Sequence, residues 1–593
     1  MCGIVGYIGK QNSSRIVLEG LKNLEYRGYD SWGIAVNYKD GIEVFKKVGE
    51  IDIKKDKLPL PKTSSSIGHT RWATHGGVNH TNAHPHYSTK KDFILAQNGI
   101  VENYQQLKEE LVKEKYRFKT ETDTEVIVRL IEEECKSSKD LRKAVNKAFN
   151  KLEGRNTIIL LDSKEDNHII AIRNGSPLVL GVGKDGIFLA SDALAFAKYT
   201  KDVVFLNNFD LVEIEGTKFN IYDANTGKKK DYKITTLNNK IKGVSKGKYD
   251  HFMIKEIVEQ KDTVLNASNF KLEELKPLLK AIKDANRVYI TGAGTAGFAS
   301  GQIAYYLRNI ANIDALDVRA YDFGTFLPIL KKEDLVIAVS QSGETADTIE
   351  ILEFAKDLGC KLGCIVNVEG STIHRMCDYK YLSNAGPEIC VASTKVFTSQ
   401  CTFGYLVSKS LIGKYKEAQM YIRELSDGLS EYFNDNTFNH IKKLTKKIKS
   451  DEHFFILGKG QNAYISLEGA LKVKEISYKH FEGFSSGELK HGVIALVEDN
   501  TPVFSIISDD IDSKDIISAT EEVKAREAFT IGVGDIKFKD ENCFKYFVPT
   551  VSSKELSALS NVIAFQLLSY FLASSLDRNI DKPRNLAKSV TVK

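Results

Sequence analysis

The chain has 593 residues, of which 42% are hydrophobic and 27% are charged, and its formal net charge at pH 7 is +5. This length exceeds what one hydrophobic core supports, so two or three domains are expected. The net charge is small and the lysines are spread along the chain, which argues against a nucleic-acid partner.

The cysteines and the apolar stretches indicate a cytoplasmic protein without a membrane span. The 8 cysteines form no Cys-x-x-Cys motif and no paired framework, so reduced thiols are expected. Lys10 and Arg15 interrupt any N-terminal apolar run, and no signal peptide is expected. The most apolar late stretch, Val562–Leu576, contains Gln566 and Ser569 and is interpreted as too short to span a bilayer.

Cys2 directly follows the initiator methionine, ahead of a strand-like run that begins at Ile4. If Met1 is removed, Cys2 carries both a thiol and a free α-amino group. That amine has a pKa of roughly 7.7 to 8.0 and can take the thiol proton. The alternative is an ordinary buried cysteine in an N-terminal strand, and processing of Met1 separates the two interpretations.

Residues 1–240 alternate strand-like runs, helical periodicity and turn signals. Predicted strands include Phe93–Ala96, Thr157–Leu161, Ile169–Ile172 and Gly186–Ala190, and predicted helices include Asn103–Glu114 and Glu125–Glu134. The pattern predicts an α+β domain in which stacked sheets lie between helices. A lysine-, glycine- and serine-rich stretch follows, so residues 241–283 are expected to form a linker and a helical lead-in.

Several N-terminal motifs stand in a recognisable order. They are the Cys2 start, Glu25–Ser31, Gly68–Gly76, Asn82–His86, Gln97–Gly99 and Glu121–Glu125. Together they resemble the N-terminal-nucleophile glutamine amidotransferases. The resemblance implies that Cys2 attacks the glutamine side-chain amide and releases ammonia, with Asn98 and the Gly99 amide as the oxyanion hole.

The same resemblance implies how glutamine is held. It assigns the substrate carboxylate to Arg71 and the α-ammonium to Asp123, with Trp72 and His75 lining the pocket or its closing loop. These residue types suit the roles, because arginine offers a planar fork to a carboxylate and aspartate offers a negative charge to an ammonium.

Histidines are concentrated in the same region and raise the alternative of a metal site. They are His69, His75, His80, His84 and His86. Their spacing follows no established ligand pattern, and most of them lie in a loop region punctuated by glycine and proline, so we expect no metal.

From about residue 285 the pattern changes to strand, glycine loop and helix. The strand Arg287–Ile290 precedes the loop Gly292–Gly297, Asp334–Val339 precedes Ser340–Thr345, and His453–Leu457 precedes a further glycine loop. This predicts α/β units with parallel sheets, and the repeated start indicates an internal duplication. The expected domains cover residues 284–425 and 445–580, followed by a tail over 581–593.

Two loops at helix starts suggest two different ligands, a dinucleotide or a phosphomonoester. Gly292, Gly294 and Gly297 form Gly-x-Gly-x-x-Gly, and Asp317 follows about twenty residues later, as in a dinucleotide-binding fingerprint. The next loop, Ser340–Thr345, instead offers hydroxyls and an amide at a helix start, which suits a phosphomonoester. A simple helix cap is the alternative for that loop.

The second half carries its own set of motifs. They are Ser340–Thr348, Ala385–Ile389 with Val391–Lys395, Leu467–Lys472 with Lys474–Tyr478, Gly487–Gly492, and Pro583–Val592. These motifs resemble the sugar-isomerase half of the glutamine–fructose-6-phosphate aminotransferase family. With the N-terminal motifs, the resemblance covers essentially the whole chain and implies glutamine and fructose 6-phosphate as substrates, glucosamine 6-phosphate as product, no cofactor, and a homodimer.

Glu468, Lys472 and Glu475 stand at i, i+4 and i+7, so a helix starting near residue 464 presents them on one face. On spacing alone this favours a salt-bridged surface stripe. By resemblance, Glu475 moves a proton between the first two sugar carbons while Lys472 and Glu468 steady the charge. His491 opens the sugar ring, and Lys588 forms a Schiff base with the open-chain ketose, beneath a tail that covers both sites.

The resemblance also assigns the sugar-phosphate contacts. The phosphate contacts are Thr295, Ser340, Gln341, Ser342 and Thr345, and the residues expected near the sugar are Val391, Ser393 and Lys474.

Two positions depart from the family pattern. Ala296 stands where a serine is usual, and Gly324 stands where an arginine is usual, so a hydroxyl and a cation are missing near the phosphate. Loss of a hydrogen bond to a charged group costs about 1.5 to 3 kcal/mol. Two alternatives follow: a related enzyme that aminates or deaminates another sugar phosphate, or a sugar-phosphate-binding regulator with residual glutaminase activity. Retention of Glu475, His491 and Lys588 argues against the regulator.

Overall fold

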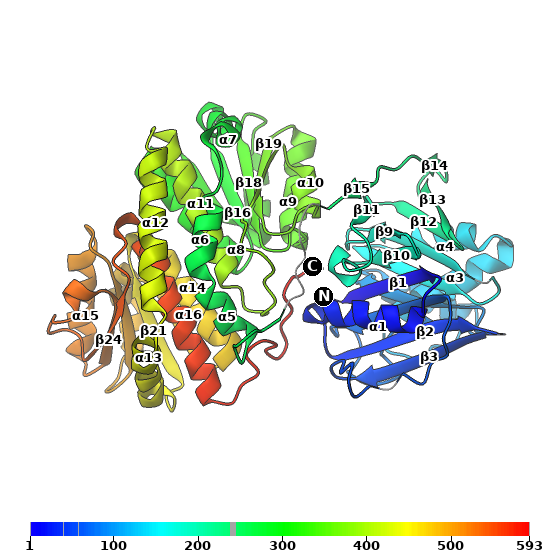
Figure 1. Cartoon of the computed structure of the whole chain (residues 1–593), viewed down its shortest axis with the longest axis horizontal. Helices are drawn as coiled ribbons and strands as arrows, with labels where there is room; N and C mark the ends of the chain where they lie inside the picture. The colour runs from blue at the N-terminus through cyan, green and yellow to red at the C-terminus, as the bar shows by residue number, and fades with distance from the viewer. Residues whose placement is uncertain (1, 40, 57, 166, 238–244, 592–593) are drawn as a thin grey trace. The chain divides into compact units, whose positions relative to one another are not determined.

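The computed structural model describes residues 2–39, 41–56, 58–165, 167–237 and 245–591. The chain divides into two compact units, Met1–Val244 with Ser589–Lys593, and Ser245–Lys588 (Figure 1). Each unit has its own sheets and its own hydrophobic core.

The first unit contains two antiparallel sheets. One sheet consists of β1 (Gly3–Gly9), β2 (Ser31–Tyr38), β3 (Gly41–Val48), β4 (Ser65–Arg71), β9 (Val179–Gly183), β10 (Gly186–Ala190), β11 (Asp202–Phe205) and β15 (Thr235–Thr236). The other consists of β5 (His86–Tyr87), β6 (Phe93–Gly99), β7 (Asn156–Asp162), β8 (His168–Asn174), β12 (Asp210–Glu215), β13 (Lys218–Asp223) and β14 (Lys229–Lys230). The strand orders are β15-β11-β9-β10-β1-β4-β2-β3 and β14-β13-β12-β8-β7-β6-β5.

Helices cover the outer faces of these sheets. They are α1 (Ser13–Asn23), α2 (Tyr104–Lys113), α3 (Thr124–Ser137) and α4 (Leu141–Phe149), with short 3-10 turns η1 (Glu25–Arg27) and η2 (Ala193–Ala195). One apolar cluster joins side chains of both sheets, a second packs α1 against the first sheet, and a third packs α2, α3 and α4 against the second sheet. The prediction of stacked sheets between helices is confirmed.

Many strands of this unit are continuous apolar runs because both faces of their sheets are buried. Every residue of β7 is buried, because one face of its sheet meets the other sheet and the opposite face meets helices. The predicted strands and helices of this region all appear, with ends that differ from the predicted runs by at most three residues, which is close to the usual uncertainty of element ends.

The second unit contains two parallel sheets with the same strand order. The first consists of β16 (Val288–Gly292), β17 (Ala315–Arg319), β18 (Leu335–Ser340), β19 (Lys361–Val366) and β20 (Tyr379–Leu382) in the order β17-β16-β18-β19-β20. The second consists of β21 (His453–Gly458), β22 (His480–Ser485), β23 (Pro502–Ile507), β24 (Phe529–Asp535) and β25 (Tyr546–Thr550) in the order β22-β21-β23-β24-β25. The matching orders agree with the predicted duplication.

Most helices of the second unit share one apolar core with both sheets. The helices are α5 (Phe252–Val258), α6 (Gln260–Ala267), α7 (Leu272–Asp284), α8 (Thr295–Ala311), α9 (Ala346–Leu358), α10 (Thr372–Met376), α11 (Lys395–Leu411), α12 (Tyr415–Tyr432), α13 (Asp435–Ile448), α14 (Ala463–Ser477), α15 (Ser513–Lys524) and α16 (Ser557–Ser575). Helices α9 and α10 pack in a second cluster on the first sheet, and α15 packs in two smaller clusters on the second sheet. The 3-10 segments are η3 (Ala320–Ile329), η4 (Gly460–Asn462), η5 (Ser486–His491), η6 (Val493–Leu496), η7 (Ile536–Phe538) and η8 (Lys554–Leu556).

The late apolar stretch is longer and less interrupted than expected. Within the described residues, the helix Lys554–Ser575 is the one stretch long and apolar enough to cross a bilayer, with 22 residues and a mean hydropathy of 1.6. The residues of its most apolar window are all buried in the unit. The polar residues Gln566 and Ser569 do not break it, because Gln566 accepts a hydrogen bond from Gln260 at 2.6 Å and Ser569 donates back to Gln566.

Some of the predicted domain limits fall within helices of the structure. Part of the expected linker, residues 238–244, lies outside the described residues. The lead-in contains α5, α6 and α7, and the expected limit at residue 425 falls inside α12. The tail is fixed to the second unit as far as Lys588, since the Asp581 carboxylate accepts from the backbone N–H groups of Phe252 and Met253 at 2.9 and 3.0 Å.

Candidate functional site

The thiol of Cys2 lies at the start of β1, beside the end of β4. The backbone N–H of Trp72 donates to Cys2 Sγ at 3.3 Å, and Asn98 Nδ2 donates to the Cys2 carbonyl oxygen at 3.0 Å. Burial raises the pKa of the Cys2 thiol. The β1–β4 pairing brings Trp72 here, and Asn98 comes from β6 in the second sheet. The structure therefore brings three predicted residues together, while Met1 lies outside the described residues.

Gly99 and Asp123 are joined through the turn that follows β6. Gly99 has a φ of +130°, and a Cβ atom there would lie 2.1 Å from the Arg155 carbonyl oxygen, so the position requires glycine. Asp123 precedes α3, is buried, and accepts a hydrogen bond from the Val101 N–H at 2.8 Å. Burial raises the pKa of the Asp123 carboxyl.

Arg71 is the last residue of β4 and holds the loop that follows it. Its guanidinium donates to the carbonyl oxygens of His75, Gly76 and Gly77 at 2.5, 2.9 and 3.0 Å. His75 is half-buried and its ring lies 5.1 Å from the ring of Tyr104. Three of the five guanidinium N–H donors of Arg71 are therefore engaged by this loop.

Three of the histidines considered as metal ligands form a buried stack. The rings of His69 and His84 lie 4.2 Å apart, and those of His84 and His86 lie 4.7 Å apart. The Nε2 atom of His69 is 2.9 Å from the Gln97 carbonyl oxygen, and that of His84 is 3.2 Å from the hydroxyl of Thr124. Burial lowers the pKa of His69 to about 3, so this imidazole is neutral.

A charged cluster that sequence reasoning missed lines a cavity of about 1420 Å³ elsewhere in this unit. His168 Nδ1 lies 2.9 Å from Asp162 Oδ2, and His168 Nε2 lies 3.6 Å from Glu213 Oε1. Burial lowers the pKa of His168, but these carboxylates raise it to about 9 overall. Cys2, Asn98 and Asp123 are not among the residues that line this cavity.

In the second unit, α14 presents the predicted carboxylate–lysine–carboxylate face. Lys472 Nζ lies 3.4 Å from Glu468 Oε1 and 2.6 Å from Glu475 Oε2. The side chains of Glu468 and Lys472 are 0% exposed and that of Glu475 is 19% exposed, so the surface-stripe alternative is wrong. Lys472 also donates to the Thr295 hydroxyl at 2.8 Å, which joins the first glycine loop to α14.

Burial and the neighbouring charges shift the pKa values of the side chains in this cluster. Burial raises the pKa of the Glu468 carboxyl to about 8. Burial lowers the pKa of Lys472, but Glu468, Glu475 and, more weakly, Glu388 raise it overall, so the ammonium is retained. The Thr295 hydroxyl also lies 3.3 Å from Glu468 Oε1. Glu475 is thus the partly exposed carboxylate beside a buried cation.

The loop Ser340–Thr345 connects β18 to the start of α9. The Ser340 hydroxyl accepts from the Gly343 N–H at 3.0 Å and lies 3.3 Å from the Thr345 hydroxyl. The Ser342 hydroxyl accepts from the Glu344 N–H at 3.1 Å. A Cβ atom on Gly343 would lie 2.0 Å from the Ser371 Oγ atom, and its φ is +66°. The loop therefore gathers hydroxyls at the N-terminus of α9, with Gln341 half-buried beside them.

The dinucleotide interpretation of the first glycine loop does not fit the structure. Asp317 accepts from the hydroxyl of Tyr464 at 2.7 Å and lies 3.6 Å from the Arg308 guanidinium, so its carboxylate is already engaged. Arg319, at the end of β17, packs beside this loop, with its guanidinium carbon 4.6 Å from the ring centroid of Phe298. Arg319, which the sequence patterns did not single out, therefore supplies a cation beside the first glycine loop.

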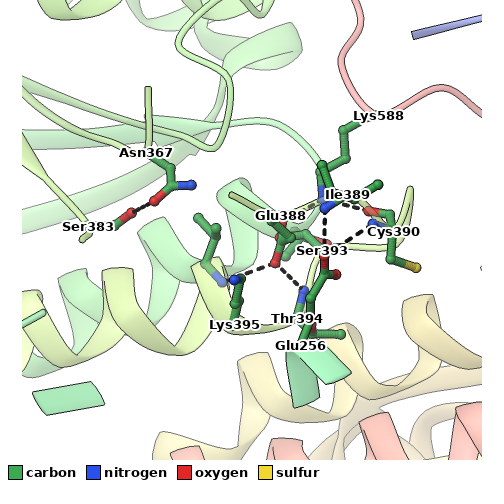
Figure 2. Close-up of polar contacts among 12 residues, drawn as sticks. Glu256, Asn367, Ser383, Glu388, Ile389, Cys390, Ser393, Thr394, Lys395 and Lys588 are labelled. Carbon is green, nitrogen blue, oxygen red and sulfur yellow. Dashed lines mark hydrogen bonds and ion pairs between the residues drawn. The ribbon is translucent and has the colours of Figure 1, made fainter. Parts of the chain in front are cut away.

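Lys588 enters a buried polar network of the second unit (Figure 2). Its ammonium donates to Glu388 Oε2 at 2.5 Å and to the Cys390 carbonyl oxygen at 2.8 Å. Ser393, expected near the sugar, donates to the same Glu388 oxygen at 2.8 Å. Val391 is buried next to this network, and its N–H donates to the Asp581 carbonyl oxygen at 3.1 Å.

Two predicted residues are not brought into these groups. His491 ends η5, is exposed, and makes no hydrogen bond to the described residues. Lys474 is exposed on α14, two positions from Lys472 and therefore on a different face of the helix. Their predicted roles at the sugar site stay predictions.

Comparison with known proteins relates the whole chain to one family. A glutamine amidotransferase domain model matches residues 69–198, and an SIS domain model matches residues 281–409 and 447–539. The chain is 39% identical over 604 residues to the glutamine–fructose-6-phosphate aminotransferase (isomerizing) of Pyrococcus horikoshii. It is also 39% identical over 615 residues to the protein of that name from Methanococcus maripaludis. Both relationships cover 100% of each chain.

A solved structure agrees for the second half. The C-terminal domain of glucosamine-fructose-6-phosphate aminotransferase from Francisella tularensis matches with a TM-score of 0.52 and 30% identity, covering 57% of this chain and 100% of that one. Because the sequence relationship extends over the full length of the relatives, the chain belongs to the glutamine–fructose-6-phosphate aminotransferase family.

Proposed function

We propose that this protein transfers the amide nitrogen of glutamine to fructose 6-phosphate and isomerises the product to glucosamine 6-phosphate. The observation that carries the proposal is the 39% identity over the full length of relatives that bear this enzyme name. Glutamine and fructose 6-phosphate are the proposed substrates, and the reaction needs no added cofactor. A homodimer and a cytoplasmic location are proposed from the family resemblance.

Ammonia release is assigned to Cys2. The thiolate attacks the amide carbon of glutamine, the C–N bond breaks as ammonia leaves, and water hydrolyses the thioester to glutamate. An N-terminal α-amino group, exposed by removal of Met1, takes the thiol proton. The hydrogen bond from Asn98 to the Cys2 carbonyl supports a place for Asn98 beside the oxyanion, with the Gly99 N–H as the second donor.

Glutamine binding is assigned to Arg71 and Asp123, with Trp72 and His75 in the loop that closes over it. The three hydrogen bonds from Arg71 to this loop support a coupling of substrate binding to loop movement. A substrate carboxylate would replace the carbonyl oxygens as the acceptor of the guanidinium donors.

The sugar chemistry is assigned to the α14 cluster, His491 and Lys588. His491 opens the sugar ring, and the Lys588 amine forms an imine with the ketose carbonyl and releases water. Ammonia adds to the imine carbon and the Lys588 amine leaves, which places the new nitrogen on the sugar. Glu475 then moves a proton between the first two sugar carbons. The short contact between Lys472 and Glu475 supports this assignment, because it holds the Glu475 carboxylate beside a buried cation that can stabilise negative charge developing on the sugar.

The phosphate is assigned to the hydroxyls around the loop Ser340–Thr345, the Gln341 amide and the Thr295 hydroxyl, and Arg319 supplies a cation at the same sheet edge. Val391, Ser393 and Lys474 are proposed near the sugar. A second candidate function follows from Ala296 and Gly324: the pocket lacks two usual phosphate contacts, which favours a related enzyme acting on another ketose phosphate or amino-sugar phosphate.

Product analysis with amide-15N glutamine and fructose 6-phosphate tests the proposal. We expect 15N-labelled glucosamine 6-phosphate from the parent protein and none from Cys2→Ala, with Cys135→Ala as a matched control because Cys135 is also a half-buried free thiol of this unit. Glutamate without labelled amino sugar would overturn the sugar assignment and leave the glutaminase assignment standing. Side-by-side turnover of other ketose phosphates would then identify the substrate.

A further inference from the structure

The buried partner of Lys588 is Glu388, a residue without a role in the reaction described above. The side chains of Lys588 and Glu388 are 1% and 0% exposed, and their charged atoms lie 2.5 Å apart. Figure 2 shows the lysine reaching down from the tail to the carboxylate. The two residues are 200 positions apart in the chain, so this ion pair fixes the tail to the first parallel-sheet domain.

Glu388 is held in one orientation by donors on both carboxylate oxygens. Its Oε1 atom accepts from the N–H groups of Thr394 and Val396 at 2.9 and 3.1 Å, at the N-terminus of α11. Its Oε2 atom accepts from the Ser393 hydroxyl at 2.8 Å as well as from Lys588. Burial alone raises the pKa of Glu388, but Lys588 and these N–H donors lower it overall, so the carboxylate is ionised.

A second buried carboxyl, Glu256 of α5, faces the same network. Its Oε1 atom accepts from the N–H groups of Ile389 and Cys390 at 2.6 and 3.4 Å. Burial and the charge of Glu388 raise the pKa of Glu256 to about 8, so it is protonated at neutral pH.

The remaining charged groups near the network are accounted for. The Lys395 ammonium donates to Glu259 Oε2 at 2.8 Å, and Asp581 caps the start of α5. Glu388 also weakly raises the pKa of the buried Lys472 ammonium, whose direct partners are Glu468 and Glu475. The direct charged partner of Lys588 is therefore Glu388.

This arrangement creates a chemical requirement. An ammonium cannot attack a carbonyl, so Lys588 must give up a proton before it forms an imine, and bulk water is excluded from its buried end. We propose that Glu388 positions the Lys588 amine and takes its proton as the imine forms, an inference that rests on the proposed function.

The protons balance without another reactant. Glu388 takes one proton from the ammonium, and the neutral amine attacks the ketose carbon, so that a C–N bond forms as the C=O π bond breaks. A proton then passes from the attacking nitrogen to the oxygen, which gives the carbinolamine hydroxyl. Glu388 then returns the proton to the carbinolamine hydroxyl, which leaves as water while the C–O bond breaks. The product is a protonated imine on Lys588, and Glu388 is a carboxylate again. Ser393 donates a hydrogen bond to the same carboxylate oxygen and is expected near the sugar, so it connects Glu388 to the proposed sugar site.

Imine trapping on the full-length protein tests this role. Fructose 6-phosphate and cyanoborohydride are added, and the reduced adduct on the Lys588 peptide is measured by mass spectrometry across neutral pH. We expect Glu388→Gln to slow trapping by about 100-fold and to make its rate rise with pH where the parent profile is flat, because base must come from solvent. Glu388→Asp should recover part of the rate and the flat profile.

Glu256→Gln is the matched control, since it removes a buried carboxyl from the same network that is already neutral. It should trap at close to the parental rate. The proposal is overturned if Glu388→Gln keeps the parental rate and pH profile, or if Glu256→Gln slows trapping as much as Glu388→Gln does.

Failure of the proposed function gives a different result. If the parent protein makes no glucosamine 6-phosphate but traps tagatose 6-phosphate on Lys588 in a Glu388-dependent way, the substrate assignment fails and the role of Glu388 stands. If the parent makes glucosamine 6-phosphate without a trapped adduct on Lys588, the role of Glu388 is overturned and the proposed function stands.

Discussion

Lys472 Nζ lies 2.6 Å from Glu475 Oε2, and the lysine side chain is fully buried while the glutamate is partly exposed. The same ammonium contacts Thr295 of the first domain and Glu468 one helical turn before it. A buried ammonium is costly unless it is paired, so the contacts of Lys472 with Thr295, Glu468 and Glu475 together stabilise its burial between the first glycine loop and α14.

We expect Lys472→Met to reduce amino-sugar formation by about 100-fold or more while glutamine hydrolysis continues. Methionine fills a similar volume but removes the cation beside Glu475 and with it the positive charge that stabilises negative charge developing on the sugar. Separate assays of glutamate release and of glucosamine 6-phosphate measure the two effects. Lys446→Met, at an exposed position of α13, is the control. Parallel loss of both activities would indicate misfolding instead.

Ala296→Ser should lower the KM for fructose 6-phosphate if the missing hydroxyl weakens phosphate binding. A recovered hydrogen bond to a charged group is worth about 1.5 to 3 kcal/mol, or roughly 10- to 150-fold in affinity. Arg319→Gln should raise the same KM, because it removes the cation packed beside this loop. Steady-state kinetics at saturating glutamine measure both. An unchanged KM in both variants would place the phosphate away from this loop.

Local patterns predicted the elements and the single-helix cluster, because the periods of strands and helices are encoded within a few residues. The spacing of Glu468, Lys472 and Glu475 predicted a shared face correctly, but it could not predict burial, which depends on Thr295 and the neighbouring sheet. The apolar stretch within α16 was judged too short because Gln566 is satisfied by Gln260, far along the chain, while Ser569 is satisfied by the Gln566 carbonyl within the helix.

Long-range contacts account for the other features that the sequence did not predict. Glu388 stood inside a recognised motif, yet its contact with Lys588 joins positions 200 residues apart. The cluster of His168, Asp162 and Glu213 spans two strand connections and has no local spacing. The hydrogen bonds from Arg71 to its own loop are accepted by backbone carbonyl oxygens. The direction of a backbone carbonyl cannot be predicted from a pattern of side chains.

The ion pairs of His168 should stabilise the first unit in acidic and neutral solution. Its folded pKa is about 9, above the usual unfolded value, so the contribution is complete below about pH 6.5 and is lost as the pH rises through about 9. A shift of this size corresponds to about 3 kcal/mol. We expect His168→Gln to reduce hydrogen-exchange protection of β8 at about pH 6 and to match the parent near pH 10.

His80→Gln, at an exposed histidine of the same unit, is the control for this experiment. Equal protection of β8 in the parent and in His168→Gln at acidic pH would contradict the prediction, because the loss of a charged partner would then have no energetic consequence.

Gly99→Ala should abolish glutamine hydrolysis while leaving imine formation at Lys588 intact. A Cβ atom at this position would meet the Arg155 carbonyl oxygen at 2.1 Å, and the φ of +130° is unfavourable for alanine, so the turn must move. The Gly99 N–H proposed for the oxyanion hole moves with it, and loss of one such donor costs about 100- to 1000-fold in rate.

Gly6→Ala is the matched control, since its Cβ would meet neighbours only at 3.5 Å or more in the same core. Glutamate release, measured with and without fructose 6-phosphate, distinguishes the two variants. Parental glutamate release in Gly99→Ala would remove Gly99 from the oxyanion hole.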